Sequence, residues 1–304
     1  MRIVVTGGAG FIGSSFVRLL DKYNSKHGGF DIVVVDKLTY ASNIERLPET
    51  VTLIEKDICD ITKEDIGDTQ YIVNFAAESH VDNSIEDGTP FIKTNVMGTF
   101  NLLEVARTLD NFEKFVQIST DEVYGDLHDY NNSKKLSVEG DRCVPSSYYS
   151  ASKSAADDIV ISAGRTFGLP FLITRTCNNY GRHQHREKFL PKVMDCIESD
   201  KPVPVYGDGG QIREWIWVED NVQVIFDLMI SEIGIYNIGT GDRCTNKEIL
   251  VNIGKIINRP VKYEYVQDRL GHDRRYGLDC SRLESVTTFE PTINLIEYLT
   301  SELL

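Results

Sequence analysis

The chain has 304 residues, a length that suits one large domain or two smaller ones with a sizeable core. Its 46 acidic and 32 basic residues give a net charge of −14, which argues against a nucleic-acid-binding protein, because such a protein needs a basic face. No apolar run approaches the roughly 20 residues of a membrane span. The first residues run directly into an expected strand and show no signal peptide, so we expect a cytoplasmic protein without a membrane segment.

The cysteines and histidines give no sign of a metal centre. The six cysteines are scattered and form no C-x-x-C, which predicts reduced thiols in a cytosolic protein. The six histidines also lack metal-ligand spacing. His183 and His185 form a close pair on a polar segment, but no acidic or cysteine partner accompanies them. We therefore expect no metal site.

Short β-branched runs alternate with helical patterns in the first half of the chain. The runs are nearly continuous in apolar residues, as is typical of parallel strands covered on both faces. Helical patterns between or after them occupy 11–23, 91–109 and 148–167. This alternation predicts an α/β fold with a doubly wound, Rossmann-like parallel sheet. The expected strands are 3–6, 31–36, 52–55, 71–75, 115–119 and 171–174.

A glycine motif follows the first expected strand and opens the first expected helix. Gly8, Gly10 and Gly13 satisfy G-x-G-x-x-G, which lets the backbone approach a pyrophosphate held at a helix N-terminus. The alternative, a glycine turn made for packing alone, is disfavoured by this context. Asp36 ends the second strand, where its carboxylate can bind ribose hydroxyls and repel a 2′-phosphate. The pattern predicts NAD in preference to NADP, although the adjoining Lys37 slightly weakens this preference.

The character of the sequence changes after residue 176. Glycine and proline become frequent and the expected elements shorten to a strand at 215–218, a helix at 219–229, a strand at 235–238 and a helix at 246–258. We expect residues 1–176 to form an NAD-binding Rossmann domain that carries the catalytic residues. Residues 177–304 would form mainly a smaller substrate-binding lobe, with a strand and helix near 215–240 returning to the first domain.

A tyrosine and a lysine lie four residues apart on the helix expected at 148–167. Tyr149 and Lys153 share one face of that helix. A nearby ammonium favours tyrosinate by lowering the pKa of the tyrosine, which can then take the proton of an alcohol while hydride leaves the same carbon. An exposed Tyr–Lys pair without function is the alternative, and the glycine motif upstream argues against it.

Three polar residues follow the strand expected at 115–119. Thr120, Asp121 and Glu122 stand at its carboxyl end, where open α/β sheets place their ligand crevice. Two carboxyls add what an elimination needs, one to protonate a leaving hydroxyl and one to take a proton from carbon. The alternative is a helix N-cap with acidic first-turn residues. Residues 123–125 do not resemble an amphipathic helix, which argues against that alternative.

Together these motifs resemble the extended short-chain dehydrogenase/reductases, and within them the nucleoside-diphosphate-glucose 4,6-dehydratases, typified by the dTDP-glucose enzymes. The resemblance covers residues 6–276, nearly the whole chain. The triplet 120–122 is its specific part, because related 4-epimerases usually lack both carboxyls there. The matching runs are 6–13, 36–40, 57–60, 76–82, 119–125, 149–153, 178–181, 187–188, 206–207 and 271–276.

The resemblance implies a redox-neutral lyase reaction with tightly held NAD. Tyr149, supported by Lys153 and Thr120, would deprotonate the glucose 4-hydroxyl while NAD takes the C4 hydride. Glu122 would remove the C5 proton, and Asp121 would protonate the departing C6 hydroxyl. Return of hydride to C6 would give a 4-keto-6-deoxy sugar. These roles need Asp121 protonated and Glu122 ionised.

The resemblance also implies binding residues and a homodimer built through the helices at 91–109 and 148–167, which would form a four-helix interface. Arg213 and Arg275 would bind the diphosphate, and Tyr206 would stack on the base, although surface charge and core packing are the alternatives. The expected cofactor-binding residues are Gly7, Gly10, Phe11, Ile12, Gly13, Asp36, Lys37, Thr39, Asp57, Ile58, Ala76, Ala77, Tyr149 and Lys153. The expected substrate-binding residues are His80, Asn178, Lys188, Phe189, Pro204, Tyr206, Arg213 and Arg275.

Several alternatives stay open at this point. Residues 182–186 depart from the family pattern, so UDP-glucose or another nucleotide hexose could replace dTDP-glucose. A nucleotide-sugar 4-epimerase shares most motifs, but Asp121 and Glu122 speak against it. A non-enzymatic binding protein on the same fold would carry degenerate catalytic residues, and none is degenerate here.

Overall fold

The computed structural model describes residues 1–127 and 134–304, and its main feature is a seven-stranded sheet. The strand order is β10-β6-β5-β4-β1-β2-β3, and every pair is parallel. The strands are β1 (Arg2–Thr6), β2 (Asp31–Asp36), β3 (Thr52–Glu55), β4 (Tyr71–Asn74), β5 (Lys114–Thr120), β6 (Phe171–Thr176) and β10 (Gly234–Ile238).

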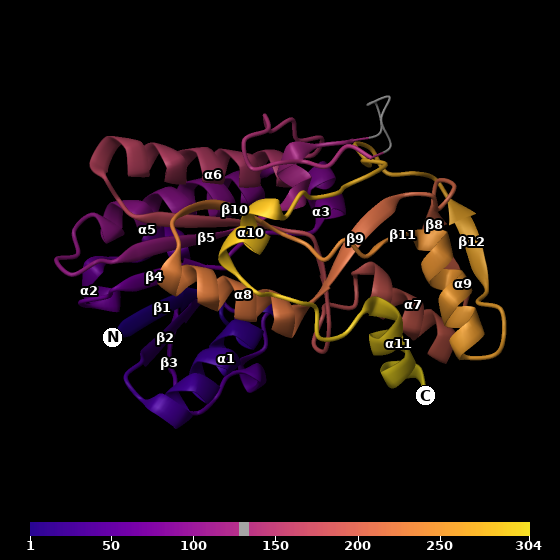
Figure 1. Cartoon of the computed structure of the whole chain (residues 1–304), viewed down its shortest axis with the longest axis horizontal. Coiled ribbons are helices and arrows are strands. Elements are labelled where there is room, and N and C mark those ends of the chain that lie inside the picture. Colours follow the sequence, from indigo (N-terminus) through magenta and orange to yellow (C-terminus); the bar gives the residue numbers. More distant parts are fainter. Residues whose placement is uncertain (128–133) are drawn as a thin grey trace.

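Long helices cover both faces of this sheet (Figure 1). On one face lie α1 (Phe11–His27) and α8 (Val218–Ser231), which pack against each other. On the other lie α5 (Thr99–Ala106) and α6 (Tyr148–Phe167). Each face has its own apolar core, the first around Phe16 and Phe226 and the second around Leu102 and Val160. The predicted doubly wound α/β sheet is confirmed.

The order of the strands reverses beside β1. Its neighbours are β2 on one side and β4 on the other, so the connections diverge from this point. Ligands of open α/β sheets bind at such a switch point, outside the carboxyl ends of the strands. The fold therefore places the glycine loop after β1 and the polar triplet after β5 on the same edge of the sheet.

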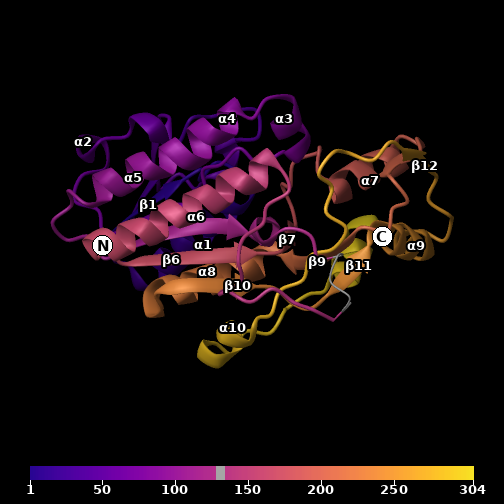
Figure 2. The ribbon, with the colours of Figure 1, turned by 90° about the horizontal axis from the view of Figure 1, so that it is seen from above.

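A smaller lobe extends beyond that edge (Figure 2). It contains a three-stranded sheet in the order β11-β9-β7 and a two-stranded sheet of β12 and β8, with a core around Tyr180, Trp215 and Leu299. β10 and α8 follow residue 176 in the sequence but lie with the large sheet. The domain boundary at residue 176 stays a prediction. The lobe contains β7 (Asn178–Tyr180), α7 (Phe189–Glu198), β8 (Val203–Tyr206), β9 (Ile212–Trp217), β11 (Arg243–Thr245), α9 (Asn246–Ile256), β12 (Tyr263–Val266) and α11 (Leu295–Leu303).

Short helical segments complete the described chain. One of them, η3, shows that the prediction of a single helix at 91–109 was wrong. The single helix expected at 91–109 is instead α4, a π-helix η3 and α5 in succession. A π-helix holds more residues per turn than an α-helix, so a periodicity of 3.6 does not detect it. The short segments are α2 (Lys63–Ile66), α3 (Val81–Glu86), α4 (Thr89–Phe91), α10 (Ser281–Val286), η1 (Ile44–Arg46), η2 (Ile58–Asp60), η3 (Ile92–Gly98) and η4 (Asp121–Tyr124).

Within η3, the side chain of Asn95 connects two parts of the sheet edge. It donates to the Glu78 carbonyl at 3.0 Å and to Ser152 Oγ at 2.8 Å, and it accepts from the Glu78 N–H at 2.9 Å. Asn95 is 1% exposed, so these bonds form in a dry environment where they are strong. The π-helix thus ties the loop after β4 to the first turns of α6.

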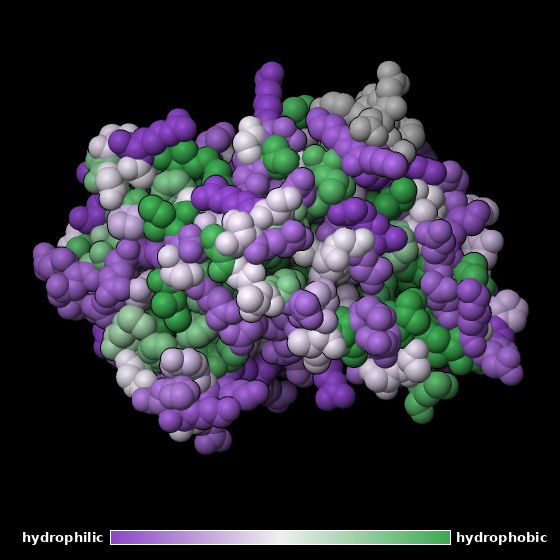
Figure 3. Space-filling model, in the orientation of Figure 1, coloured by the Kyte–Doolittle hydropathy of each residue, from purple (hydrophilic) through white to green (hydrophobic). Residues whose placement is uncertain are grey.

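The surface agrees with the high net charge. Figure 3 shows hydrophilic residues spread over one face of the molecule, with hydrophobic residues between them. In the described parts of the chain, no helix is both long enough and apolar enough to cross a membrane.

Candidate active site

A cavity of 310 Å³ lies at the carboxyl ends of the central strands. Small-molecule sites usually enclose roughly 300 to 1,000 Å³, so its size suits a ligand. Its walls come from the glycine loop, the loop after β2, η4, the start of α6 and residues 176–188. The predicted residues that line it are Gly7, Gly10, Phe11, Ile12, Gly13, Asp36, Lys37, Thr39, Ile58, Ala76, Ala77, Thr120, Asp121, Glu122, Tyr149, Lys153, Asn178 and Lys188.

The glycine loop leaves no room for side chains. Gly7 has φ +65°, and a Cβ added there would lie 2.6 Å from the Ala76 nitrogen. A Cβ on Gly13 would lie 2.3 Å from the Gly7 carbonyl oxygen. Gly10 is the N-cap of α1 and has no side chain to cap the helix, so the first N–H groups of this 17-residue helix stay open toward the cavity. The loop therefore fits the pyrophosphate of a dinucleotide.

Asp36 is held firmly at the cavity wall. Its carboxylate accepts hydrogen bonds from the N–H of Ala9 at 3.0 Å, the N–H of Leu38 at 2.9 Å and the hydroxyl of Ser42 at 2.8 Å. An ionised carboxylate has about four acceptor positions, so one stays open for a ribose hydroxyl. The three donors fix its orientation before any ligand arrives.

The neighbouring Lys37 is already engaged by protein groups. Its Nζ forms an ion pair with Glu78 at 3.1 Å and donates to the Thr94 hydroxyl at 3.1 Å. Because Glu78 balances this cation, Lys37 offers little to a 2′-phosphate. The geometry at Asp36 and Lys37 therefore fits NAD.

Thr120 ends β5, and Asp121 and Glu122 begin the turn of 3₁₀ helix that follows it, η4. The Thr120 hydroxyl caps this turn by accepting from the Glu122 N–H at 3.3 Å. Our argument against a helix at this position was wrong, because a single turn is too short to show an amphipathic pattern. The cap and the predicted site coexist, since Thr120, Asp121 and Glu122 all line the cavity.

The two carboxyls of this turn have different surroundings. Asp121 is 3% exposed, and burial followed by the charge of Glu122 raises its pKa well above the usual range. Burial also raises the pKa of Glu122, but the cations of Arg269, Arg213 and Lys188 oppose that rise. Asp121 Oδ2 has no hydrogen-bond partner among the described residues. Asp121 is thus the better proton donor of the two, and Glu122 the better base.

Tyr149 and Lys153 both face the cavity, but their electrostatics correct a prediction. Burial and the charge of Glu122 raise the pKa of Tyr149 above its usual value, and a hydrogen bond with Thr120 opposes the rise. Burial lowers the pKa of Lys153 to about 8, and its Nζ donates to the Ile118 carbonyl at 2.6 Å. The expected lowering of the Tyr149 pKa by Lys153 is wrong for the folded chain, because burial and acidic neighbours dominate.

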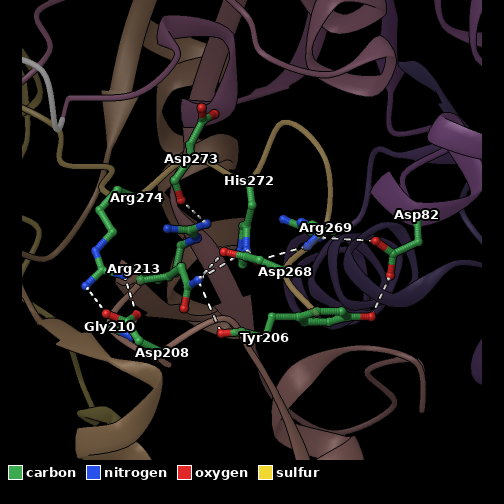
Figure 4. Close-up of polar contacts among 11 residues, drawn as sticks. Asp82, Tyr206, Asp208, Gly210, Arg213, Asp268, Arg269, His272, Asp273 and Arg274 are labelled. Carbon is green, nitrogen blue, oxygen red and sulfur yellow. Dashed lines mark hydrogen bonds and ion pairs between the residues drawn. The ribbon is translucent and has the colours of Figure 1, made fainter. Parts of the chain in front are cut away.

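Two predicted substrate residues lie in a polar cluster beside the cavity (Figure 4). Arg213 donates to the Asp273 carbonyl at 2.9 Å, and its guanidinium stands 4.3 Å from the ring centre of Tyr276. The hydroxyl of Tyr206 donates to Asp82 at 3.3 Å. Both side chains are therefore positioned by protein contacts.

Other predicted residues lie outside the cavity lining. Arg275 donates to the Lys135 carbonyl at 2.9 Å, and Asp57 caps η2 by accepting from the Cys59 N–H at 3.0 Å. Their binding roles stay predictions. His80 lies 3.9 Å from Glu187, Phe189 begins α7 and packs on the core of the smaller lobe, and Pro204 lies in β8.

Arg269 belongs to the site but was not among the residues predicted from the sequence. Its guanidinium lies 3.8 Å from Asp82, its charge acts on Glu122, and its Nε is buried without a hydrogen-bond partner in the described chain. The sequence holds a cluster of arginines at 269, 274 and 275, but the matching run at 271–276 includes Arg275 and ends short of Arg269.

The loop at 182–186, noted only as a departure from the family pattern, also helps to close the cavity. Gln184 and His185 line it together with Glu187. The hydroxyl of Tyr40 donates to Glu187 at 3.3 Å, and the rings of Tyr40 and His185 meet edge to face at 5.3 Å. These contacts join the loop after β2 to the loop before α7.

Known proteins share both the sequence pattern and the fold. Residues 3–239 match the NAD dependent epimerase/dehydratase family. The chain belongs to this family. A dTDP-glucose 4,6-dehydratase of Haemophilus influenzae is 41% identical over 96% of this chain and 94% of its own length. The Haloferax volcanii protein Agl12, described as a low-salt glycan biosynthesis protein, is 44% identical over 94% of this chain and 92% of its own length.

The family's solved structures superpose closely. The crystal structure of DesIV, a dTDP-glucose 4,6-dehydratase from Streptomyces venezuelae with NAD bound, has a TM-score of 0.92 and 36% identity. The match covers 100% of this chain and 96% of that chain. These comparisons confirm the predicted resemblance to the dehydratases, the extended short-chain dehydrogenase/reductase fold and NAD as the cofactor.

Proposed function

We propose that the protein is an NAD-dependent nucleoside-diphosphate-glucose 4,6-dehydratase, with dTDP-glucose as its substrate. The observation that carries the proposal is the placement of Asp121 and Glu122 in one cavity with Tyr149 and Lys153. The alcohol-oxidising pair alone would serve a dehydrogenase or an epimerase. The two carboxyls supply the acid and the base that removal of water requires.

The residues divide the reaction between them. NAD, when bound at the glycine loop, would supply an acceptor for the C4 hydride and a donor that returns it to C6 after water has left, while C5 regains a proton. Tyr149, held by Thr120, takes the proton of the C4 hydroxyl from its ionised state, which burial makes less populated by raising the pKa of Tyr149. The C4 ketone makes the C5 proton acidic, and Glu122 removes it. Asp121, kept protonated by burial, gives its proton to the C6 hydroxyl as it leaves.

The test is to offer the purified protein dTDP-glucose, UDP-glucose and CDP-glucose separately and to follow the products by mass spectrometry. We expect a product lighter by one water and most rapid turnover with dTDP-glucose. A C4 epimer of unchanged mass would identify an epimerase instead. If no sugar nucleotide loses water, the proposal fails.

We also propose a homodimer formed through the helices beside α6. Three large apolar side chains stand exposed along η3 and α5, namely Ile92 at 48%, Met97 at 54% and Phe100 at 46%. Tyr148 at the start of α6 is 62% exposed. Apolar groups gathered on adjacent helices are typical of a surface that a partner covers. A second copy would meet this surface to form four helices.

A cytoplasmic location is part of the proposal. All six cysteines are free thiols, two of them buried, which fits a reducing compartment. Fractionation of the producing cells tests it, and recovery of the activity outside the cytoplasmic fraction would contradict it.

A further inference from the structure

A buried acid lies behind the cavity, one helical turn after Lys153. Asp157 is on α6 and is 0% exposed. It is not part of the cavity lining, so it touches neither cofactor nor substrate. Acidic residues are seldom fully buried unless they are paired, and this one needs an explanation.

Asp157 connects three elements of the sheet edge. Its Oδ2 accepts from the Ser119 hydroxyl at 3.0 Å and from Arg175 Nε at 3.0 Å. Ser119 is on β5, directly before Thr120, and Arg175 is on β6. The guanidinium of Arg175 also stands 4.8 Å from the ring centre of Tyr124, in η4. Asp157 therefore braces the strand end that carries the catalytic turn.

The same carboxylate faces the catalytic lysine. Residues four apart on a helix are neighbours, so Asp157 and Lys153 share one face of α6. No carboxylate of the described chain lies within ion-pair distance of the Lys153 ammonium. Asp157 is the acid whose charge supports that ammonium against the effect of burial. The second carboxylate oxygen, Oδ1, has no hydrogen-bond partner among the described residues and stays available for this longer-range attraction.

We propose that Asp157 is a positioning residue, which keeps Lys153 protonated and holds the end of β5 in place for catalysis. The proposal rests on the function proposed above for Tyr149 and Lys153. A merely structural Asp–Arg pair would leave the protonation of Lys153 unchanged, and this difference decides the test.

Four variants separate the two roles. Asp157→Asn removes the charge and keeps the shape, while Asp157→Glu keeps the charge. Asp157→Asn combined with Arg175→Gln removes the buried Asp–Arg ion pair and leaves no unpaired guanidinium, in case the single variant fails to fold. Asp158→Asn makes the same charge change at an exposed position of the same helix and is the matched control.

The first measurement does not depend on the sugar reaction. Lys153 is labelled with acetic anhydride over a range of pH in the full-length protein, and its acetylation is quantified by mass spectrometry against the other lysines. Loss of a nearby opposite charge lowers the pKa of an ammonium by roughly 1 to 3 units. We expect the midpoint for Lys153 to fall by that amount in Asp157→Asn and in the double variant, and to stay in place in Asp158→Asn.

The second measurement is the pH profile of kcat/KM with the sugar nucleotide. We expect the alkaline limb to move to lower pH by a similar amount and to return in Asp157→Glu. The other titratable groups near Lys153 stay unchanged in these comparisons, except for Arg175 in the double variant. Those that interact with Asp157, or with its partners Arg175 and Tyr149, are Tyr149 on α6, Asp121, Glu122 and Tyr124 in η4, Cys143 in the preceding loop and Arg175 on β6.

The outcomes are distinct. If the Lys153 midpoint is the same in the parent protein, Asp157→Asn and the double variant, Asp157 has only a structural role and the inference is overturned. If the midpoint moves but the parent protein converts no sugar nucleotide, the proposed function fails while the link between Asp157 and Lys153 holds.

Discussion

Two adjacent carboxyls in one turn of helix differ because their side chains meet different neighbours. Asp121 is buried beside the Thr120 hydroxyl, at 3.3 Å, and its strongest charged neighbour is Glu122. Glu122 instead faces cations from the smaller lobe, Arg269 and Arg213 among them. Two carboxyls one position apart in the sequence thus differ in which of them holds the proton. Residues about 90 and 150 positions further along the chain cause this difference.

The first prediction concerns these two acids. Asp121→Asn and Glu122→Gln should still permit oxidation at C4 and should stall loss of water, because each removes one proton-transfer group. General acid or base catalysis contributes roughly 100- to 10,000-fold, so product formation should fall by that factor. Rapid-mixing absorbance of the reduced cofactor would show it accumulating without product. Full product formation by either variant would refute the assigned roles.

The second prediction concerns stability and pH. The pKa of Asp121 is raised in the folded chain, so the folded state binds this proton more tightly than the unfolded state. Stability therefore falls as pH rises from the unfolded pKa through the folded pKa, and the penalty is complete above the latter. Asp121→Asn removes the penalty and should stabilise the protein by about 1 kcal/mol at neutral pH.

Thermal unfolding of both proteins at about pH 4 and about pH 8 checks this sign. The gain in stability from Asp121→Asn should be larger at the higher pH. There the unfolded parent releases this proton readily, whereas burial in the folded parent opposes its release. The exposed Asp158→Asn should show no comparable pH-dependent gain. A loss of stability in Asp121→Asn at the higher pH would contradict the electrostatic account.

Among the elements, the glycine loop and the start of α1 pack so closely that Gly7 and Gly13 leave no space for a side chain. The third prediction is that Gly13→Ala abolishes NAD binding, because its Cβ would collide with the Gly7 carbonyl oxygen at 2.3 Å and push the loop out of shape. Equilibrium binding of NAD, followed by tryptophan fluorescence or calorimetry, measures the loss. Gly140→Ala is the control, since its Cβ meets nothing within 4 Å. Undiminished binding by Gly13→Ala would show that the loop does not hold the phosphates.

The elements also show how far the sequence could predict this protein. Strands such as β1 and β2 are continuous apolar runs, so their residues reveal them directly. The π-helix η3 was predicted as part of an α-helix, because a pattern with a period of 3.6 does not detect the wider turn of a π-helix. The 3₁₀ turn η4 was too short to leave a pattern.

The site follows the same division between local and distant signals. The residues around NAD come from contiguous motifs, so most of those predicted line the cavity. Arg269 reaches Glu122 from a loop that no local pattern connects to it. Likewise, the pKa of Tyr149 depends on burial and on the acids of the turn η4, and a Tyr–Lys spacing carries no information about either.

At the scale of the whole molecule, the cavity lies where the large sheet meets the smaller lobe. Residues from Gly7 to Lys188 line it, and the smaller lobe adds the cations of Arg213 and Arg269 that act on Glu122. The net charge of −14 would repel an anionic ligand at long range, so these local arginines matter for a sugar diphosphate. A higher ionic strength screens this repulsion. We therefore expect the rate of substrate binding to increase when salt is added to a low-salt buffer.

The last prediction tests the assembly. Met97→Glu combined with Phe100→Glu places charges on the exposed apolar face of η3 and α5, and it should convert the proposed dimer into monomers. Central apolar anchors of an interface each contribute about 2 kcal/mol or more, so two buried charges there outweigh the remaining contacts. Sedimentation velocity measures the change. Val251→Glu, at an equally exposed apolar position on α9 of the smaller lobe, should leave the assembly intact. A parent protein that sediments as a monomer would show that there is no such dimer. A double variant that still dimerises would show that the interface lies elsewhere.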